Sequence, residues 1–276
     1  MKPAIVILCV LCLWPVRLAA QEPGERAVSP EVQRLVAEGQ TAALEAKLGP
    51  SPSADERHLL AQAYANRARR TTDGVGRTQA WQAAQAQYEE WLPELERAAR
   101  LGGPLDAVRL AAGRVEYGTL LLSGPAAGEL GEFEITLGRH GDRERLRTLL
   151  NAARTQFEQA ETLLTPLMAD LSQREEQLLA VGLYDTLVHA DSDMRLNLGW
   201  TNYYLGVLED KNAAVRQSYL SAAERRFQEL VNSGPEGALR SHANMALGMA
   251  QRELGRYREA ERNLAAALAD GGESAA

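Results

Sequence analysis

Hydrophobic side chains recur every three or four positions along most of the chain, which places them on one face of a helix rather than one face of a strand. The pattern predicts ten helical segments, over residues 31–48, 54–70, 77–100, 104–122, 143–169, 172–189, 193–209, 213–232, 236–254 and 257–270. Glycine and proline stand between several of them, as in Gly49-Pro50 and Ser233-Gly234-Pro235, where they are expected to end one helix and precede the next. An all-α fold is therefore expected.

The amino-acid composition agrees with this prediction. Of 276 residues, 45 are Ala and 41 are Leu, whereas Ile occurs only three times. Because β-branched residues are the preferred side chains of strands, material for a sheet is scarce. The length allows one large domain or two small ones with a well-packed core.

Residues 123–142 are the one long stretch without a helical period. They contain five glycines and a short alternating run, Glu132-Phe133-Glu134-Ile135-Thr136. The run predicts a long loop or a small hairpin. Long loops inside a compact domain are often functional, and the alternative is a surface insertion without a specific role.

One spacing recurs along the helical segments: an Ala, an aromatic residue or Leu four positions later, and an apolar residue three positions after that. It occurs as Ala84-Tyr88-Trp91, Ala153-Phe157-Ala160, Ala223-Phe227-Leu230 and Ala260-Leu264-Ala267. These spacings put the three side chains on one helical face, where the Ala allows a neighbouring helix to approach closely. A helix with its own small-residue contact precedes each triplet, at Leu60-Ala61, Ala112-Gly113, Leu205-Gly206 and Leu247-Gly248.

This arrangement resembles the tetratricopeptide repeat (TPR), a helix–turn–helix unit of about 34 residues. The final unit is the most similar, since Leu247-Gly248, Gly255, Tyr257 and the last triplet fall in register, although Gln251 replaces the first-helix Tyr. Earlier units are stretched, and segment 172–189 has no regular place in the repeat. The resemblance implies a right-handed superhelical stack of antiparallel helix pairs, a TPR-like α-solenoid. The alternative is a bundle whose Ala- and Leu-rich helices produce such triplets by chance.

The resemblance also implies a binding surface. The first helices of stacked repeats line a concave wall that binds peptides or extended chain segments. The residues that would face this wall are His58, Gln62, Asn66, Arg114, Tyr117, Trp200, Tyr203, His242, Met245 and Arg252. Trp200 and Tyr203 are the preferred hot spot, because aromatic residues carry much of the energy at interfaces. The alternative is that both pack against segment 172–189.

The first twenty residues resemble a signal peptide. Lys2 is followed by an apolar stretch over 4–14 and by Leu18-Ala19-Ala20, a small-residue end suited to signal peptidase. The stretch is too short to span a bilayer, which needs about 20 residues, and the alternative is a segment that is retained. We therefore predict an exported protein, with the bacterial periplasm as the first choice and the extracellular space as the second.

Three further segments follow from this interpretation. Residues 21–30 are predicted to be a linker, 31–270 the helical repeat domain and 271–276 a tail. Both cysteines, Cys9 and Cys12, lie in the signal segment, so disulfides and cysteine-ligated zinc are excluded from the mature chain.

The charge of the chain argues against nucleic acid as a partner. The chain carries 30 Lys and Arg against 37 Asp and Glu, and removal of Lys2 and Arg17 changes the net charge from −7 to −9. A surface of this sign repels phosphate backbones. A protein or peptide partner is therefore expected, and no nucleic acid.

We find no catalytic motif in the sequence: it has no phosphate-binding loop, zinc-protease helix, calcium loop or nucleophile elbow. The cluster His189-Ala190-Asp191-Ser192-Asp193 could hold a divalent ion. The preferred interpretation is that Asp191 or Asp193 caps a helix beginning near Met194. No cofactor and no metal are predicted.

These observations predict a non-enzymatic protein–protein interaction scaffold or assembly factor of the bacterial cell envelope. The alternative is an exported enzyme or small-ligand-binding protein that uses Glu132, Glu134, Arg139, His140 and Asp142 of the 123–142 insertion. Self-association through the C-terminal helix is a third option, because no separate polar helix caps the last repeat.

Overall fold

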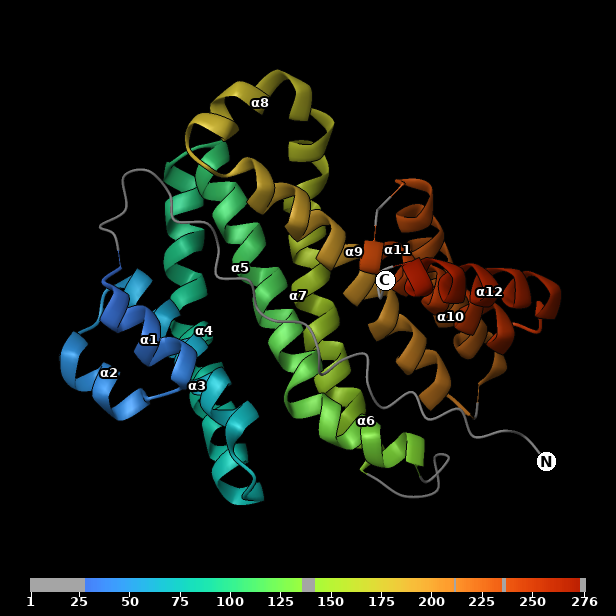
Figure 1. Ribbon diagram of the computed structural model, residues 1–276, viewed down its shortest axis with the longest axis horizontal. Coiled ribbons are helices and arrows are strands. Elements are labelled where there is room, and N and C mark those ends of the chain that lie inside the picture. Colours follow the sequence, from blue (N-terminus) through green and yellow to red (C-terminus); the bar gives the residue numbers. More distant parts are fainter. Residues whose placement is uncertain (1–27, 136–141, 211, 235–236, 274–276) are drawn as a thin grey trace.

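The computed structural model describes residues 28–135, 142–210, 212–234 and 237–273, and all regular secondary structure in these residues is α-helical. The helices, labelled in Figure 1, are α1 Pro30–Glu38, α2 Thr41–Leu48, α3 Ala54–Arg70, α4 Gly74–Leu101, α5 Pro104–Ser123, α6 Pro125–Ile135, α7 Arg143–Ala169, α8 Leu171–Ala180, α9 Tyr184–Leu208, α10 Ala213–Asn232, α11 Gly237–Glu253 and α12 Tyr257–Glu273. The prediction of an all-α fold is confirmed for this part of the chain.

Several helices begin where a side chain can satisfy the free N–H groups of the first turn. At α3, Ser53 Oγ accepts a hydrogen bond from Glu56 N, and Glu56 Oε2 accepts one from Ser53 N at 2.7 Å. Asp73 caps α4 and Asp142 caps α7 in the same way, because each carboxylate accepts a hydrogen bond from a backbone N–H group of the first turn. Such caps stabilise a helix by about 1 kcal/mol each, so these polar residues help to determine where α3, α4 and α7 start.

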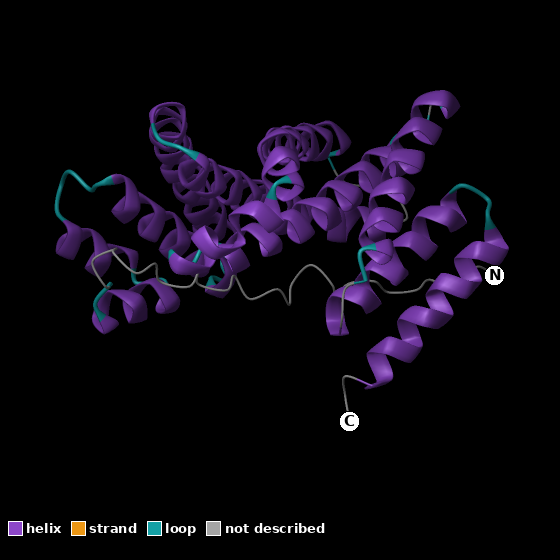
Figure 2. Cartoon of the chain, turned by 90° about the horizontal axis from the view of Figure 1, so that it is seen from above, coloured by secondary structure: helices purple, strands orange, loops and turns teal. Residues whose placement is uncertain are grey.

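Neighbouring helices in the chain are also neighbours in space. The most extensive contacts lie within four pairs, α3 with α4, α5 with α7, α9 with α10, and α11 with α12. Each second helix then packs against the first helix of the following pair, as α4 does on α5, α7 on α9, and α10 on α11. Figure 1 shows the order along the long axis, from α1 and α2 at one end to α10, α11 and α12 at the other, and Figure 2 shows the same helices from above.

The alanines that begin the four triplets, Ala84, Ala153, Ala223 and Ala260, are all buried. Glycines on the first helices allow the closest approaches. A Cβ at Gly118 would lie 2.7 Å from Phe157 Cε1, and one at Gly248 would lie 2.7 Å from Leu264 Cγ. The small contact opposite Phe157 is therefore Gly118 rather than Ala112-Gly113, and Gly113 instead faces Trp91 of α4.

The predicted helices differ from the structure in three places. Segment 31–48 is two helices, because Gly39 takes a left-handed φ of 68° that ends α1. Residues 125–135 form α6 rather than a loop or hairpin. The break predicted near 190–192 lies instead at Gly182, whose φ is 72°. Positive φ costs glycine little, which explains why two of these breaks fall where they do.

Asp191 and Asp193 consequently lie inside α9 and cap no helix. The Asp191 side chain is buried and accepts a hydrogen bond from Arg195 Nε at 2.8 Å, one turn further along. Charged groups that are buried are normally paired in this way. Asp191 therefore forms an ion pair within α9 and does not cap a helix, contrary to the prediction.

The ends of the chain are described only in part. The signal segment 1–20 and the linker up to residue 27 lie outside the described residues. Ser29 caps α1 and Pro30 is its first residue, so this helix begins one residue before the predicted position 31. At the other end α12 continues to Glu273 and includes part of the predicted tail. Among the described helices, none has both the length and the hydrophobicity needed to cross a bilayer.

Candidate functional site

A cluster of polar side chains joins α3 and α5. Glu116 of α5 accepts hydrogen bonds from two residues of α3: His58 Nε2 lies 2.6 Å from Glu116 Oε2, and Gln62 Nε2 lies 3.0 Å from Glu116 Oε1. His58 and Gln62 are four residues apart, so both side chains leave α3 on the same face. We call His58, Gln62 and Glu116 the α3–α5 polar cluster.

Aromatic rings surround this cluster. The imidazole of His58 is stacked on the indole of Trp91, with ring centroids 4.1 Å apart and planes 6° apart. Tyr88 is fully buried, donates a hydrogen bond to Glu116, and stacks on Tyr117 with centroids 5.2 Å apart. Helices α3, α4 and α5 therefore all contribute to one environment that combines a carboxylate, an imidazole and the aromatic side chains of Tyr88, Trp91 and Tyr117.

The carboxylate of Glu116 is held in its ionised form. Burial alone would raise its pKa, but the charge of His58 and hydrogen bonds from His58, Gln62 and Tyr88 outweigh this, so the pKa of Glu116 lies below its usual value. Its side chain is 23% exposed. With its oxygens occupied by these donors, Glu116 is arranged to hold three helices together rather than to take up a proton.

Arg114 organises a second polar contact on the other side of α5. Its guanidinium donates to Glu96 of α4 and to Gln156 and Gln159 of α7, with 2.8 Å between Arg114 Nη1 and Gln156 Oε1. Burial lowers the pKa of Arg114, and Glu96 opposes this shift. The side chain is buried and links α4, α5 and α7, so it is part of the interior rather than of an open wall.

Trp200 and Tyr203, the preferred hot spot, lie in the interior as well. They are 3% and 5% exposed and belong to a core that α9 forms with α10, α11 and parts of α5, α6 and α7. Trp200 contacts Tyr203 and Phe227 edge-on and stacks on Tyr204. The rings that contact them belong to α9 and α10, and this core contains no described residue of segment 172–189. In this structure they therefore offer almost no surface to a partner.

The other predicted wall residues lie closer to solvent. Asn66 is half-buried and donates from Nδ2 to the carbonyl of Val36 at 3.0 Å. His242, Met245 and Arg252 all belong to α11 and are half-buried; burial lowers the pKa of His242. Of the ten residues, the structure brings together His58, Gln62 and Tyr117 around Tyr88, and places Arg114, Trp200 and Tyr203 inside.

The sequence analysis did not select Glu116, although a signal for it exists. In the second half of the 104–122 segment, Arg114 and Glu116 are the only charged residues among apolar and small ones. Isolated charges at such positions need partners when they are buried. Their partners come from three other helices, which no local pattern identifies.

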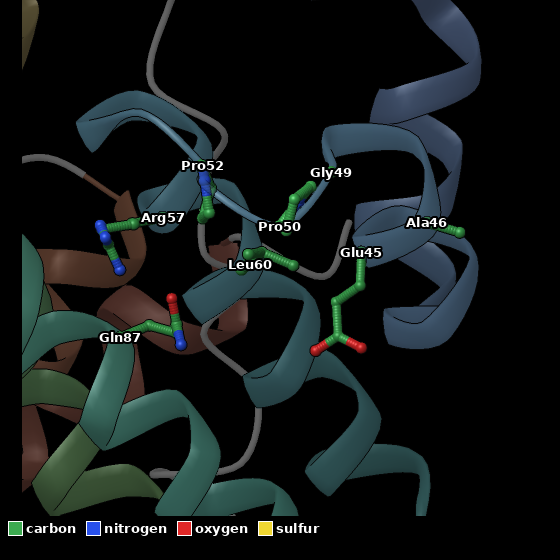
Figure 3. A pocket seen from close by; sticks show the side chains of 8 residues that line it. All are labelled: Glu45, Ala46, Gly49, Pro50, Pro52, Arg57, Leu60 and Gln87. Atoms are coloured by element: carbon green, nitrogen blue, oxygen red, sulfur yellow. The ribbon is translucent and has the colours of Figure 1, made fainter.

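A separate hollow of about 580 Å³ opens at the N-terminal end of the fold, between α2, α3 and α4 (Figure 3). The loop after α2 and the buried Leu60 of α3 both contribute to its lining. Its volume falls within the range of about 300–1,000 Å³ typical of ligand sites. The residues that line it are Glu45, Ala46, Gly49, Pro50, Pro52, Arg57, Leu60 and Gln87.

The residues proposed for the alternative functions are described only partly. Arg139 and His140 lie outside the described residues, and Asp142 caps α7 by accepting from Arg145 N at 2.9 Å. Of the 123–142 insertion, the structure thus describes helix α6 and the residue Asp142, which caps α7. Within the described ranges, no three His, Cys, Asp or Glu side chains come together in a group that could hold a metal ion.

Comparison with protein-family models gave no match, and neither did comparison with curated proteins or with solved structures.

Proposed function

We propose that the protein is a non-enzymatic protein-interaction scaffold of the bacterial cell envelope, built as a TPR-like α-solenoid. The observation that carries this proposal is the order of packing: each second helix contacts its own first helix and the first helix of the next pair. An array of this kind leaves a long row of first helices on one side, and such rows bind protein segments in helical repeat proteins.

The arrangement of polar groups supports the same proposal. Glu116, Arg114 and Asp191 are each occupied by partners from the chain itself. Glu116 and Arg114 join helices, whereas Asp191 pairs with Arg195 inside α9. The surface that remains for a partner includes the half-buried side chains of Met245 and Arg252 on α11. The signal-like segment 1–20 supports export to the envelope.

Photo-crosslinking in envelope extract tests the proposal. A benzophenone amino acid is placed on a first helix at Met245 or Arg252 and, as matched controls, on second helices at the exposed Gln82 or Gln228. We expect a discrete crosslinked partner from the first-helix positions only. Equal crosslinking from both sets, or none from any of the four positions, contradicts the proposal.

Self-association through α12 belongs to the same proposal. Tyr257 and Leu268 of this helix are 70% and 80% exposed, whereas Trp81 and Leu150, which stand three residues before the triplet alanines as Tyr257 does, are buried. Light scattering at two protein concentrations, with Leu268→Glu for comparison, shows whether a second copy covers this surface. A mass that stays monomeric at both concentrations removes self-association from the proposal.

A further inference from the structure

The hollow between α2, α3 and α4 combines an apolar floor with an acidic rim. Leu60 lies at its base, and Pro50, Pro52 and Ala46 supply apolar sides. In Figure 3, Leu60, Pro50 and Pro52 lie between Glu45 on one side and Arg57 and Gln87 on the other. A ligand that fits this hollow therefore needs an apolar part as well as a polar head.

The charge at the rim is negative. Arg57 is the one cation among the residues that line the hollow, and it contacts two carboxylates of α4: Glu90 directly and Glu94, with 3.9 Å between Arg57 Nε and Glu94 Oε1. Glu90 and Glu94 lie outside the lining and compensate the charge of Arg57. Glu45 is the one carboxylate among the lining residues, and it accepts a hydrogen bond from the neutral hydroxyl of Tyr64. With the charge of Arg57 compensated, the charge of Glu45 favours a cationic ligand.

Gln87 supplies an unused hydrogen-bond acceptor beside the hollow. Its Oε1 is buried and accepts no hydrogen bond, and it lines the hollow together with Leu60 and Arg57. A buried acceptor without a donor costs about 1–3 kcal/mol. The terminal torsion of a glutamine side chain is broad, so a small rotation of the amide can present this oxygen to an N–H group in the hollow.

We propose that this hollow binds a lysine or arginine side chain of an exposed segment of a protein partner, an inference that rests on the proposed scaffold function. Lysine and arginine have an apolar stem and a charged head, which match the Leu60 floor and the acidic rim. The head donates to Gln87 Oε1 and lies near Glu45, and the partner's backbone crosses the loop formed by Gly49–Pro52.

The first test uses a random dodecapeptide library as the probe, selected against the full chain and the Glu45→Lys variant. We expect peptides with lysine or arginine to be enriched by the unaltered chain and lost with Glu45→Lys. Enrichment of acidic or uncharged peptides, or no enrichment, overturns the inference. The control is Glu259→Lys, which makes the same charge change at an exposed site on α12.

The second test measures an enriched synthetic peptide by fluorescence polarisation. We expect Glu45→Lys to weaken binding at least about tenfold and Gln87→Leu about two- to tenfold. Gln87→Leu removes a buried acceptor that has no partner, so the melting temperature should stay equal or rise, which separates lost binding from lost folding. If neither variant changes the affinity of a basic peptide, that peptide binds outside the hollow, and the inference is overturned.

The two proposals fail in different ways. If crosslinking from α11 captures a partner while neither hollow variant changes any peptide's affinity, the hollow inference is wrong and the scaffold proposal stands. If all four crosslinking positions capture nothing, the scaffold proposal fails independently of the peptide result.

Discussion

Gly118 of α5 lies against the ring of Phe157 of α7 so closely that a Cβ at position 118 would be 2.7 Å from Phe157 Cε1. Phe157 is fully buried and belongs to the largest core of the described residues. Real Cβ contacts are longer than this, so a methyl group there requires the ring or a helix to move. The separation between α5 and α7 therefore depends on the absence of a side chain at Gly118.

We predict that Gly118→Ala destabilises the protein by about 1–3 kcal/mol, the usual cost of overpacking a core. Urea unfolding followed by circular dichroism measures the free energy of unfolding. The matched control is Gly128→Ala in α6, where a Cβ would meet nothing within 4 Å; it should be neutral or stabilising by up to about 1 kcal/mol. Equal effects at the two sites would contradict the tight contact.

Arg114 gives a second prediction, because it links three helices from a buried position. Arg114→Met keeps the apolar stem but leaves Glu96, Gln156 and Gln159 without their donor. We expect a loss of about 2–4 kcal/mol, measured by urea unfolding.

The control for Arg114→Met is a substitution of Arg100, a second arginine near Glu96. Arg100 Nη2 lies 3.9 Å from Glu96 Oε2, and its side chain is 79% exposed. Exposed ion pairs contribute little, so Arg100→Met should change stability by no more than about 0.5 kcal/mol. A similar loss from both variants would show that burial of Arg114 is not the cause.

Glu116 gives a prediction for the pH dependence of stability. Its folded-state pKa lies below the usual value of 4.5, because His58, Gln62 and Tyr88 outweigh the effect of burial. The unfolded chain then binds a proton first as the pH falls, so this contribution to stability is present above about pH 4.5 and is lost as the pH falls through the lower folded-state pKa.

Unfolding midpoints in urea at pH 7, 5, 4 and 3 measure this effect. Glu116→Gln should be less stable than the unaltered chain at pH 7, and the difference should shrink toward pH 3. Glu259→Gln, at an exposed site of α12, is the control and should run parallel to the unaltered chain. A constant difference between Glu116→Gln and the unaltered chain at all four pH values would disprove the assignment.

Trp200 gives a prediction that separates a core residue from a binding residue. Since Trp200 is buried against Tyr204 and Phe227, Trp200→Ala should cost about 3–5 kcal/mol of stability. Tyr257→Ala removes an exposed ring and should stay within about 0.5 kcal/mol. Thermal unfolding of both variants checks this, and an unchanged melting temperature for Trp200→Ala would mean that the ring is not part of the core.

Much of the helical pattern could be predicted from local sequence. Helices α3, α5, α7, α10 and α11 lie close to their predicted limits, and the four triplets identify which helices pair. The triplet alanines are buried as their spacing requires, since a period of 3.6 residues puts them on one face. The α6 helix was missed because its glycines, Gly128 and Gly131, weaken the helical pattern even though helical φ and ψ are open to them.

The candidate sites depend on residues that are far apart in the sequence. His58 and Glu116 are 58 positions apart, and Leu60 and Gln87 meet at the hollow only because α3 and α4 form a pair. The spacing of residues could predict on which face of α9 Trp200 lies. It could not predict that other helices bury this face, because a helix can pack against neighbours on more than one side.

The sequence alone determined that the described chain is helical, that the triplet alanines are buried, and which helices pair, because these follow from local periodicity and side-chain size. Only the tertiary structure decided that Trp200 and Arg114 lie inside, that Glu116 joins α3 to α5, and that an acidic hollow opens beside Gln87. Burial and pairing of charges depend on which helices meet, and that is a property of the packed chain as a whole.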